Sequence, residues 1–279
     1  HQVQLFVLLA LTGVFLYDWT TAPRKAARAG SFALAAVFAA LVGGLVLAPA
    51  WEYGSRSYRW VNLPSPLRHN ETVPYIGHTP FAVPPRSLLG VVTPLEGAVA
   101  NPFIGVVAAS LAMLGVAACW STRLVRVHAC LALAGLAFSM GAYSLLHGLL
   151  YAVVPLLDKA RSPSQALVVF HFGLLVVTAH GLDALRAPAP WTRRLSRSLV
   201  VTAGLLLAIT LAASATASPR GRSVLFTAAI ALLLAAVLYA RFHAGAVLLL
   251  LAELSAGTAY MVRPRSNPQA PNHLDRLGQ

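Results

Sequence analysis

Long apolar stretches recur along this chain, and they constrain its fold more than any other feature of the sequence. A helix needs about 20 apolar residues to cross a bilayer core of roughly 30 Å. By that rule we predict seven or eight membrane-spanning helices, joined mostly by short polar loops. We expect Pro49 to end the second span, Asn101-Pro102 to begin the third, and Ser144 to begin an interfacial helix over 144–154. The predicted spans cover residues 3–17, 31–50, 101–120, 129–141, 162–185, 199–215, 223–241 and 246–262.

Composition supports the same class and excludes others. Only 10% of the 279 residues are charged, whereas 58% are hydrophobic, and a soluble domain carries about 25% charged residues. A water-soluble globular enzyme and a disordered chain are therefore excluded. The two cysteines, Cys119 and Cys130, both lie in apolar runs, which excludes a disulfide scaffold. The predicted fold class is all-α, a polytopic transmembrane helical bundle.

The formal net charge of +13 does not indicate nucleic-acid binding, because the basic residues form short clusters between apolar stretches. Such clusters orient membrane helices and contact anionic lipid headgroups. The short basic loops after residues 17, 120 and 185 are therefore predicted to be cytoplasmic. Membrane lipids are expected partners. The clustered basic residues are Arg24, Lys25, Arg28, Arg123, Arg126, Arg186, Arg193, Arg194 and Arg197.

The loop of about fifty residues at 51–100 is the one long segment between spans, and positive-inside reasoning makes it extracytoplasmic. Loops this long inside compact domains are usually functional. Within it, residues 88–92 are predicted to form an amphipathic helix. We divide the chain into a transmembrane domain over 1–262, which includes this loop, and the start of an extracytoplasmic segment over 263–279. Because the chain begins at His1 within an apolar run, we expect it to be an internal fragment.

Charged residues at membrane boundaries are candidate site residues. Glu52 and Arg59 follow the second predicted span, and Arg161 stands one residue before a Ser162-Pro163 helix start. A guanidinium beside the free N–H groups of a helix N-terminus suits a phosphate. The alternative interpretation is that each arginine snorkels to lipid headgroups.

Glu253 is the only acid well inside an apolar stretch. An intramembrane carboxylate is costly, and it marks a functional-site hypothesis that faces protein or water rather than lipid. The alternative is a structural partner for an arginine or a hydroxyl on a neighbouring helix. The sequence contains no CxxC, no HExxH and no phosphate-binding glycine loop. It therefore identifies no cofactor and gives no support for a divalent metal.

A series of short motifs runs along the chain. In order, these are His1-Gln2, Ala48-Pro49-Ala50-Trp51-Glu52, Ser57 and Arg59, Gly141, Tyr151, Pro155, Arg161, Pro163, Gly181-Leu182-Asp183-Ala184-Leu185, Glu253-Leu254 and Asn267-Pro268. The series resembles the YfhO family of bacterial membrane proteins, within the GT-C class of lipid-linked sugar transferases. The run after Pro163 departs from the family, because Ser164-Gln165 replace a frequent second arginine. The acids that GT-C enzymes carry in their first extracytoplasmic loop are expected upstream of His1.

The resemblance implies a protein of the bacterial cytoplasmic (inner) membrane that transfers a sugar from a polyprenyl-phosphate donor to an extracytoplasmic acceptor. That acceptor would be an envelope glycopolymer or a protein. It implies Arg161 and Arg59 as phosphate contacts and Glu52 as a carboxylate near the acceptor groove, with the catalytic base outside this chain. Two alternatives stay open, a transporter or flippase and a non-catalytic scaffold of envelope assembly. A second buried charge opposite Glu253 would favour the transporter.

Overall fold

The computed structural model is helical over nearly all the residues that it describes, and it contains no β-strand among them. It describes the chain apart from residues 1, 22, 24, 59–63, 69–70, 95–100, 155–156, 158–161, 187–192, 196, 203, 206–218, 241 and 263–279. The all-helical class predicted from the apolar stretches is therefore confirmed for the described residues.

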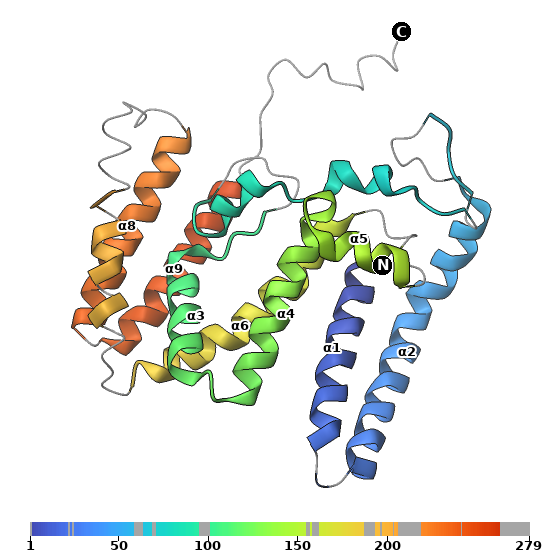
Figure 1. Cartoon of the computed structure of the whole chain (residues 1–279), viewed down its shortest axis with the longest axis horizontal. Coiled ribbons are helices and arrows are strands. Elements are labelled where there is room, and N and C mark those ends of the chain that lie inside the picture. The colour runs from blue at the N-terminus through green and yellow to red at the C-terminus, as the bar shows by residue number, and fades with distance from the viewer. Residues whose placement is uncertain are drawn as a thin grey trace.

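The longer elements are α-helices, and short 3₁₀ helices connect them (Figure 1). The α-helices are α1 (Gln2–Thr21), α2 (Lys25–Arg56), α3 (Gly105–Cys119), α4 (Arg123–Ser139), α5 (Leu145–Val153), α6 (Leu167–Ala184), α8 (Pro219–Tyr239) and α9 (His243–Val262). The 3₁₀ helices are η1 (Tyr75–Phe81), η2 (Pro85–Val91), η3 (Gly141–Tyr143) and η5 (Pro163–Ala166).

Helices α3, α4 and α6 form the central block, in which glycines bring the backbones together. A Cβ atom on Gly181 of α6 would overlap the carbonyl of Leu111 in α3, and one on Gly115 would lie 3.0 Å from the Gly181 nitrogen. On the other side of α6, a Cβ on Gly173 would lie 2.8 Å from a backbone nitrogen of α4. Small residues drive such close packing between helices in membranes. Helix α6 is therefore held on both sides by backbone contacts.

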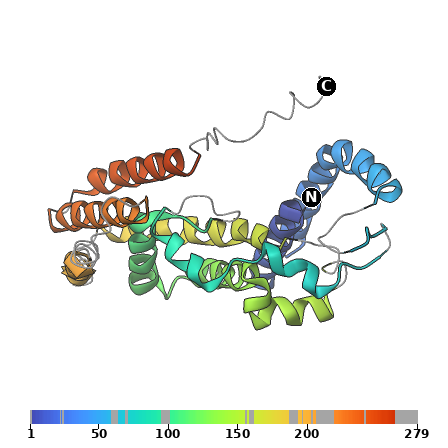
Figure 2. The ribbon, with the colours of Figure 1, turned by 90° about the horizontal axis from the view of Figure 1, so that it is seen from above.

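Two helix pairs flank this block on opposite sides (Figures 1 and 2). Helices α8 and α9 pack beside α3, where Val107, Leu111 and Leu234 are fully buried in one apolar cluster. Helices α1 and α2 form a hairpin on the other side, and α2 presents Leu34 and Leu45 almost fully exposed. Apolar side chains facing outward are expected where lipid, rather than water, surrounds a helix.

Among the described residues, three helices are long and apolar enough to cross a membrane. They are Lys25–Leu45, Pro163–Ala184 and Gly221–Tyr239, while Gly105–Cys119 and His243–Ala259 are apolar but shorter. This is the pattern of a membrane protein. The number of seven or eight spans stays a prediction, and the predicted span at 199–215 lies largely outside the described residues.

Two predicted helix boundaries are wrong. Helix α2 continues through Pro49 to Arg56, although Pro49 was expected to end it; proline is tolerated inside membrane helices where other groups satisfy the freed backbone. Helix α3 begins at Gly105 and not at Asn101-Pro102. The Asn101 Oδ1 atom instead accepts a hydrogen bond from the Phe103 nitrogen at 3.1 Å.

Two predictions of short helices have different outcomes. A helix predicted at 144–154 is confirmed as α5, in which the Ser144 hydroxyl accepts a hydrogen bond from the Leu146 nitrogen at 3.3 Å; its interfacial position stays a prediction. Residues 88–92 were expected to form an amphipathic helix, and the structure has the 3₁₀ helix η2 over Pro85–Val91 in that place.

The segment between α2 and α3 packs across helix ends through backbone hydrogen bonds. The Val83 nitrogen donates to the Ser139 carbonyl at the end of α4, at 2.9 Å, and the Ile104 nitrogen donates to the Val91 carbonyl at 2.9 Å. The Thr227 hydroxyl of α8 lies 3.4 Å from the Val92 carbonyl. The described parts of this segment therefore lie along one end of the central block of α3, α4 and α6.

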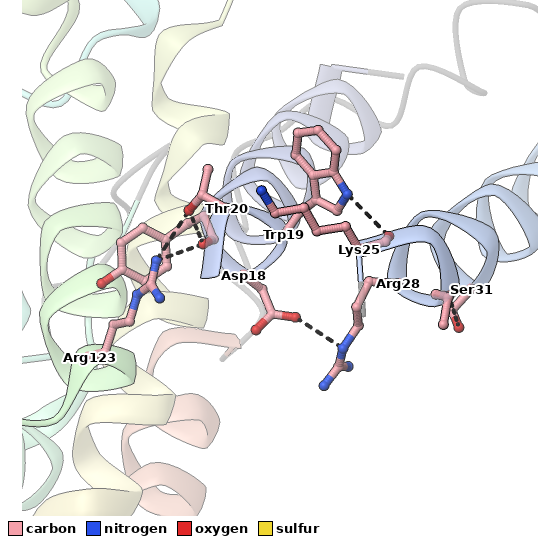
Figure 3. Close-up of polar contacts among 9 residues, drawn as sticks. Asp18, Trp19, Thr20, Lys25, Arg28, Ser31 and Arg123 are labelled. Carbon is pink, nitrogen blue, oxygen red and sulfur yellow. Dashed lines mark hydrogen bonds and ion pairs between the residues drawn. The ribbon is translucent and has the colours of Figure 1, made fainter. Parts of the chain in front are cut away.

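The opposite end of α4 joins the block to the α1–α2 hairpin (Figure 3). The Arg123 guanidinium lies 3.6 Å from the ring centre of Tyr17 and donates to the Tyr17 carbonyl at 2.7 Å. It thereby satisfies a carbonyl in the last turn of α1, where a cation also suits the helix dipole. Within the hairpin, Arg28 pairs with Asp18 at 3.7 Å. This is the end predicted to be cytoplasmic.

Candidate functional site

Glu253 of α9 is fully buried, and its carboxylate meets the first turn of α3. Its Oε1 atom accepts a hydrogen bond from the Val106 nitrogen at 2.6 Å, and its Oε2 atom accepts one from the Val107 nitrogen at 2.8 Å. The first N–H groups of a helix have no partner inside the helix, and they carry its positive dipole end. Glu253 therefore caps α3 from a helix that lies far along the chain.

Gly105 makes room for this carboxylate. Its φ of +84° lies in the left-handed region, which glycine adopts without the penalty that a side chain brings. A Cβ atom there would also overlap the Glu253 carboxyl group, at 2.8 Å from Oε1. One helical turn further along α9, a Cβ on Gly257 would lie 2.7 Å from the Phe103 ring. Both glycines thus let α9 approach the start of α3.

These contacts show which groups the Glu253 carboxylate meets among the described residues. Its partners are backbone amides, in place of the arginine or hydroxyl that the structural interpretation expected. Because both carboxylate oxygens accept hydrogen bonds from α3, the group is positioned to hold two helices together. We assign it no part in proton transfer.

The other predicted site residues are not brought to Glu253. Glu52 lies at the end of α2 with 66% of its side chain exposed, and it pairs with Arg56 at 3.1 Å. Helices α2 and α9 stand on opposite sides of the central block (Figure 1). Arg59 and Arg161 lie outside the described residues. Glu52 is therefore an exposed carboxylate in a surface ion pair, which contributes little to stability.

A histidine–tyrosine cluster around two buried histidines, which the sequence interpretation missed, joins η1 to α5. It consists of Tyr75, His78, Phe138, His147 and Tyr151. His78 and His147 are each 1% exposed, and their ring centres lie 5.3 Å apart. The Phe138 ring lies 4.8 Å from His147, and the Tyr151 ring lies 5.3 Å from His78. The Tyr151 hydroxyl also donates to the Val73 carbonyl at 2.9 Å.

The cluster keeps His147 uncharged at neutral pH. Burial, together with the positive charge that His78 would carry, lowers the pKa of His147 from 6.5 to about 4. Its Nδ1 atom is buried and has no hydrogen-bond partner among the described residues. One sequence signal was available, because His147 and Tyr151 are four residues apart and share a helix face.

Gly141 and Pro163 lie close to each other, and Tyr151 belongs to the histidine–tyrosine cluster itself. Gly141, with φ of +53°, lies where a Cβ would stand 2.8 Å from Ala82 and 3.0 Å from Pro163. Pro163 is the first residue of η5, which leads directly into α6. Tyr151 contacts Val73 on the same side. The segment between α2 and α3 thus packs on the positions that carry the motif.

The described residues contain no group of three or more His, Cys, Asp or Glu side chains arranged to hold a metal ion. Comparison with protein-family models, with curated proteins and with solved structures finds no match in any of the three.

Proposed function

We propose that the chain is the membrane-embedded part of a GT-C-like glycosyltransferase of the bacterial cytoplasmic membrane. It would transfer a sugar from a polyprenyl-phosphate donor to an envelope glycopolymer or protein. The observation that supports this proposal is that Gly141 lies against Ala82 and Pro163, while the Tyr151 hydroxyl donates to Val73 of the same segment between α2 and α3. The resemblance to the YfhO family includes these three positions among its motifs.

In the proposed chemistry, cations act on the donor phosphate and carboxylates act on the acceptor. Arg161 lies two residues before Pro163, the first residue of η5, and its guanidinium would bind the donor phosphate by two parallel hydrogen bonds. Arg59 would be a second phosphate contact. As the sugar leaves the lipid phosphate, these cations would stabilise the growing negative charge. A carboxylate upstream of His1 would take the proton of the acceptor hydroxyl, and Glu52 would lie near the acceptor.

The test is sugar transfer from a radiolabelled polyprenyl-phosphate donor by the full-length protein, with variants of Arg161. Hydrogen bonds to charged groups contribute about 1.5–3 kcal/mol each, so Arg161→Ala should weaken apparent donor affinity about tenfold or more. Arg161→Lys keeps the charge but loses the planar fork, and should weaken it less. The matched control is Arg186→Ala, an exposed arginine beyond the far end of α6 that pairs with Asp183 at 3.4 Å.

The outcomes separate the proposed roles. Donor affinity equal to wild type in both Arg161 variants would mean that this arginine contacts lipid headgroups and that the phosphate site is wrong. A full-length protein that binds donor and transfers no sugar would contradict the enzyme and favour the flippase or scaffold alternative. The environment of Glu253 does not favour a transporter, because backbone amides face its carboxylate.

A further inference from the structure

Helix α5 lies where a candidate membrane span begins. Its Leu146 side chain packs in one apolar cluster with Phe138, in the last turn of α4, and with Ala166, the last residue of η5. The helix that starts at Pro163 is long and apolar enough to cross a membrane. The nine residues of α5 extend over about 14 Å, which is less than half of a bilayer core of roughly 30 Å. Helix α5 therefore lies at the boundary of a span and is too short to cross the bilayer itself.

One side of α5 is exposed and apolar. Leu145, Leu149 and Val153 are 94%, 65% and 72% exposed, and residues four apart share one face of a helix. No Asp, Glu, Lys or Arg occurs between Arg126 and Asp158 in the sequence. A contiguous exposed apolar face of this kind marks a contact with a membrane or with another protein.

The position of this face favours lipid as its partner. A bilayer crossed by the Pro163–Ala184 helix ends near the level of α5, because α5 packs against the start of that helix. Tyr143, just before α5, is 55% exposed, and tyrosine is enriched at membrane–water interfaces. The first charged residues after α5 in the sequence are Asp158 and Lys159, as expected where a chain leaves the apolar layer for the headgroups.

The opposite side of α5 contacts η1. Because an α-helix turns about 100° per residue, His147 stands about 200° around the axis from Leu145. The His147 side chain is 1% exposed, and the Tyr75 ring centre lies 5.4 Å from its own. One turn further along α5, the Tyr151 hydroxyl donates to the Val73 carbonyl at 2.9 Å. Helix α5 thus joins its exposed apolar side to the segment between α2 and α3.

We propose that α5 docks into a phospholipid bilayer through Leu145, Leu149 and Val153, and that this docking holds η1 at the membrane surface. Helices that lie in the plane of the interface bury their apolar side about 5–10 Å into the boundary between headgroups and acyl chains. The lipid-facing residues and the segment that α5 carries go beyond the interfacial helix predicted from the sequence. The proposal does not depend on sugar transfer, since it rests on the exposure and contacts of α5.

The experiment is depth-dependent fluorescence quenching of the full-length protein in phosphatidylcholine nanodiscs, with Cys119 and Cys130 replaced. An environment-sensitive dye is attached to Leu149→Cys, and to Leu145→Cys in a second sample. Each label should shift its emission to the blue and lose most of it to lipids that carry a nitroxide near the headgroup end of the acyl chain. A nitroxide at the far end of the chain should quench it less, and aqueous iodide should quench it least.

Two exposed positions provide matched controls. Leu41 lies near the middle of α2 and is 69% exposed, so a label on Leu41→Cys should be quenched more strongly by the deep nitroxide than by the shallow one. Arg68 is exposed in the segment between α2 and α3, so a label on Arg68→Cys should be quenched by iodide and little by either lipid.

A substitution tests whether docking holds η1. Leu149→Asp places a carboxylate among acyl chains, which is unfavourable, and hydrogen exchange at residues 75–81 should lose protection in these nanodiscs. Leu149→Met keeps an apolar side chain and should retain wild-type protection there. Unchanged protection in Leu149→Asp would show that η1 does not depend on the docking of α5.

The quenching pattern decides the docking itself, whether or not the aspartate variant folds. Labels on α5 that behave like the label at position 68 would mean that this face lies in water. Labels shielded from iodide and from both lipids would mean that protein, either another segment or a second copy of the chain, covers it. Either result would overturn the proposal.

Discussion

Removal of the Glu253 carboxylate should destabilise the contact between α9 and α3 by several kilocalories per mole. This carboxylate accepts two hydrogen bonds from backbone nitrogens, at 2.6 and 2.8 Å. Hydrogen bonds to charged groups contribute about 1.5–3 kcal/mol each. Glu253→Ala removes both, so the free energy of unfolding should fall by about 3–6 kcal/mol.

Glu253→Gln should keep one of the two hydrogen bonds and lose the other. Its carbonyl oxygen still accepts one N–H group, while its NH₂ group cannot accept the other, so we expect roughly half the loss of the alanine variant. Glu253→Lys places a cation against the positive end of the α3 dipole, and it should be the least stable of the three. The order of stability is therefore wild type, Gln, Ala and Lys.

The assay is unfolding of the full-length protein in mixed micelles by SDS titration, with local exchange at residues 104–108 as a second readout. Glu52→Gln is the control, because Glu52 is an exposed carboxylate in a surface pair with Arg56, and its loss should cost less than about 1 kcal/mol. If Glu253→Ala costs no more than this control, or if exchange at 104–108 stays unchanged, Glu253 does not cap α3.

Two further predictions concern packing and orientation. Gly181→Ala should lower the free energy of unfolding by about 1–3 kcal/mol, because its Cβ overlaps the Leu111 carbonyl; Gly13→Ala, whose Cβ meets nothing within 4 Å, should not lower it in the same titration. With both native cysteines replaced, a cysteine at Arg194 should resist impermeant thiol reagents in intact cells, and one at Arg68 should react. The reverse labelling would overturn the predicted orientation.

The parts of the structure that could be predicted from the sequence are those that local sequence patterns determine. Apolar stretches identified a helical membrane protein, and Ser144 marked the start of α5 because a serine cap acts within its own helix. The start of α3 was missed for the opposite reason. Its first amides are capped by Glu253, 147 residues further along the chain than Val106, and no local pattern near Asn101 records that contact.

The histidine–tyrosine cluster was missed because tertiary packing creates it. His78 belongs to a proline-rich segment and His147 to a short helix, and in sequence each is an isolated polar residue among apolar neighbours. Only the packing of η1 on α5 brings the two rings within 5.3 Å. The motif residues Gly141 and Pro163 were identified by resemblance. The close approach of Gly141 to Ala82 also depends on tertiary packing, which no local sequence pattern records.

During synthesis in the cell, the first turn of α3 lacks its capping carboxylate until Glu253 has been made. The Val106 nitrogen emerges from the ribosome 147 residues before its partner Glu253, which corresponds to roughly 7–30 s at about 5–20 residues per second. Throughout that interval the first turn of α3 must find substitute acceptors in water, headgroups or an insertion factor. Nascent chains arrested before Glu253 should therefore remain recognisable to the quality-control machinery, and release should follow only once α9 has entered the bilayer.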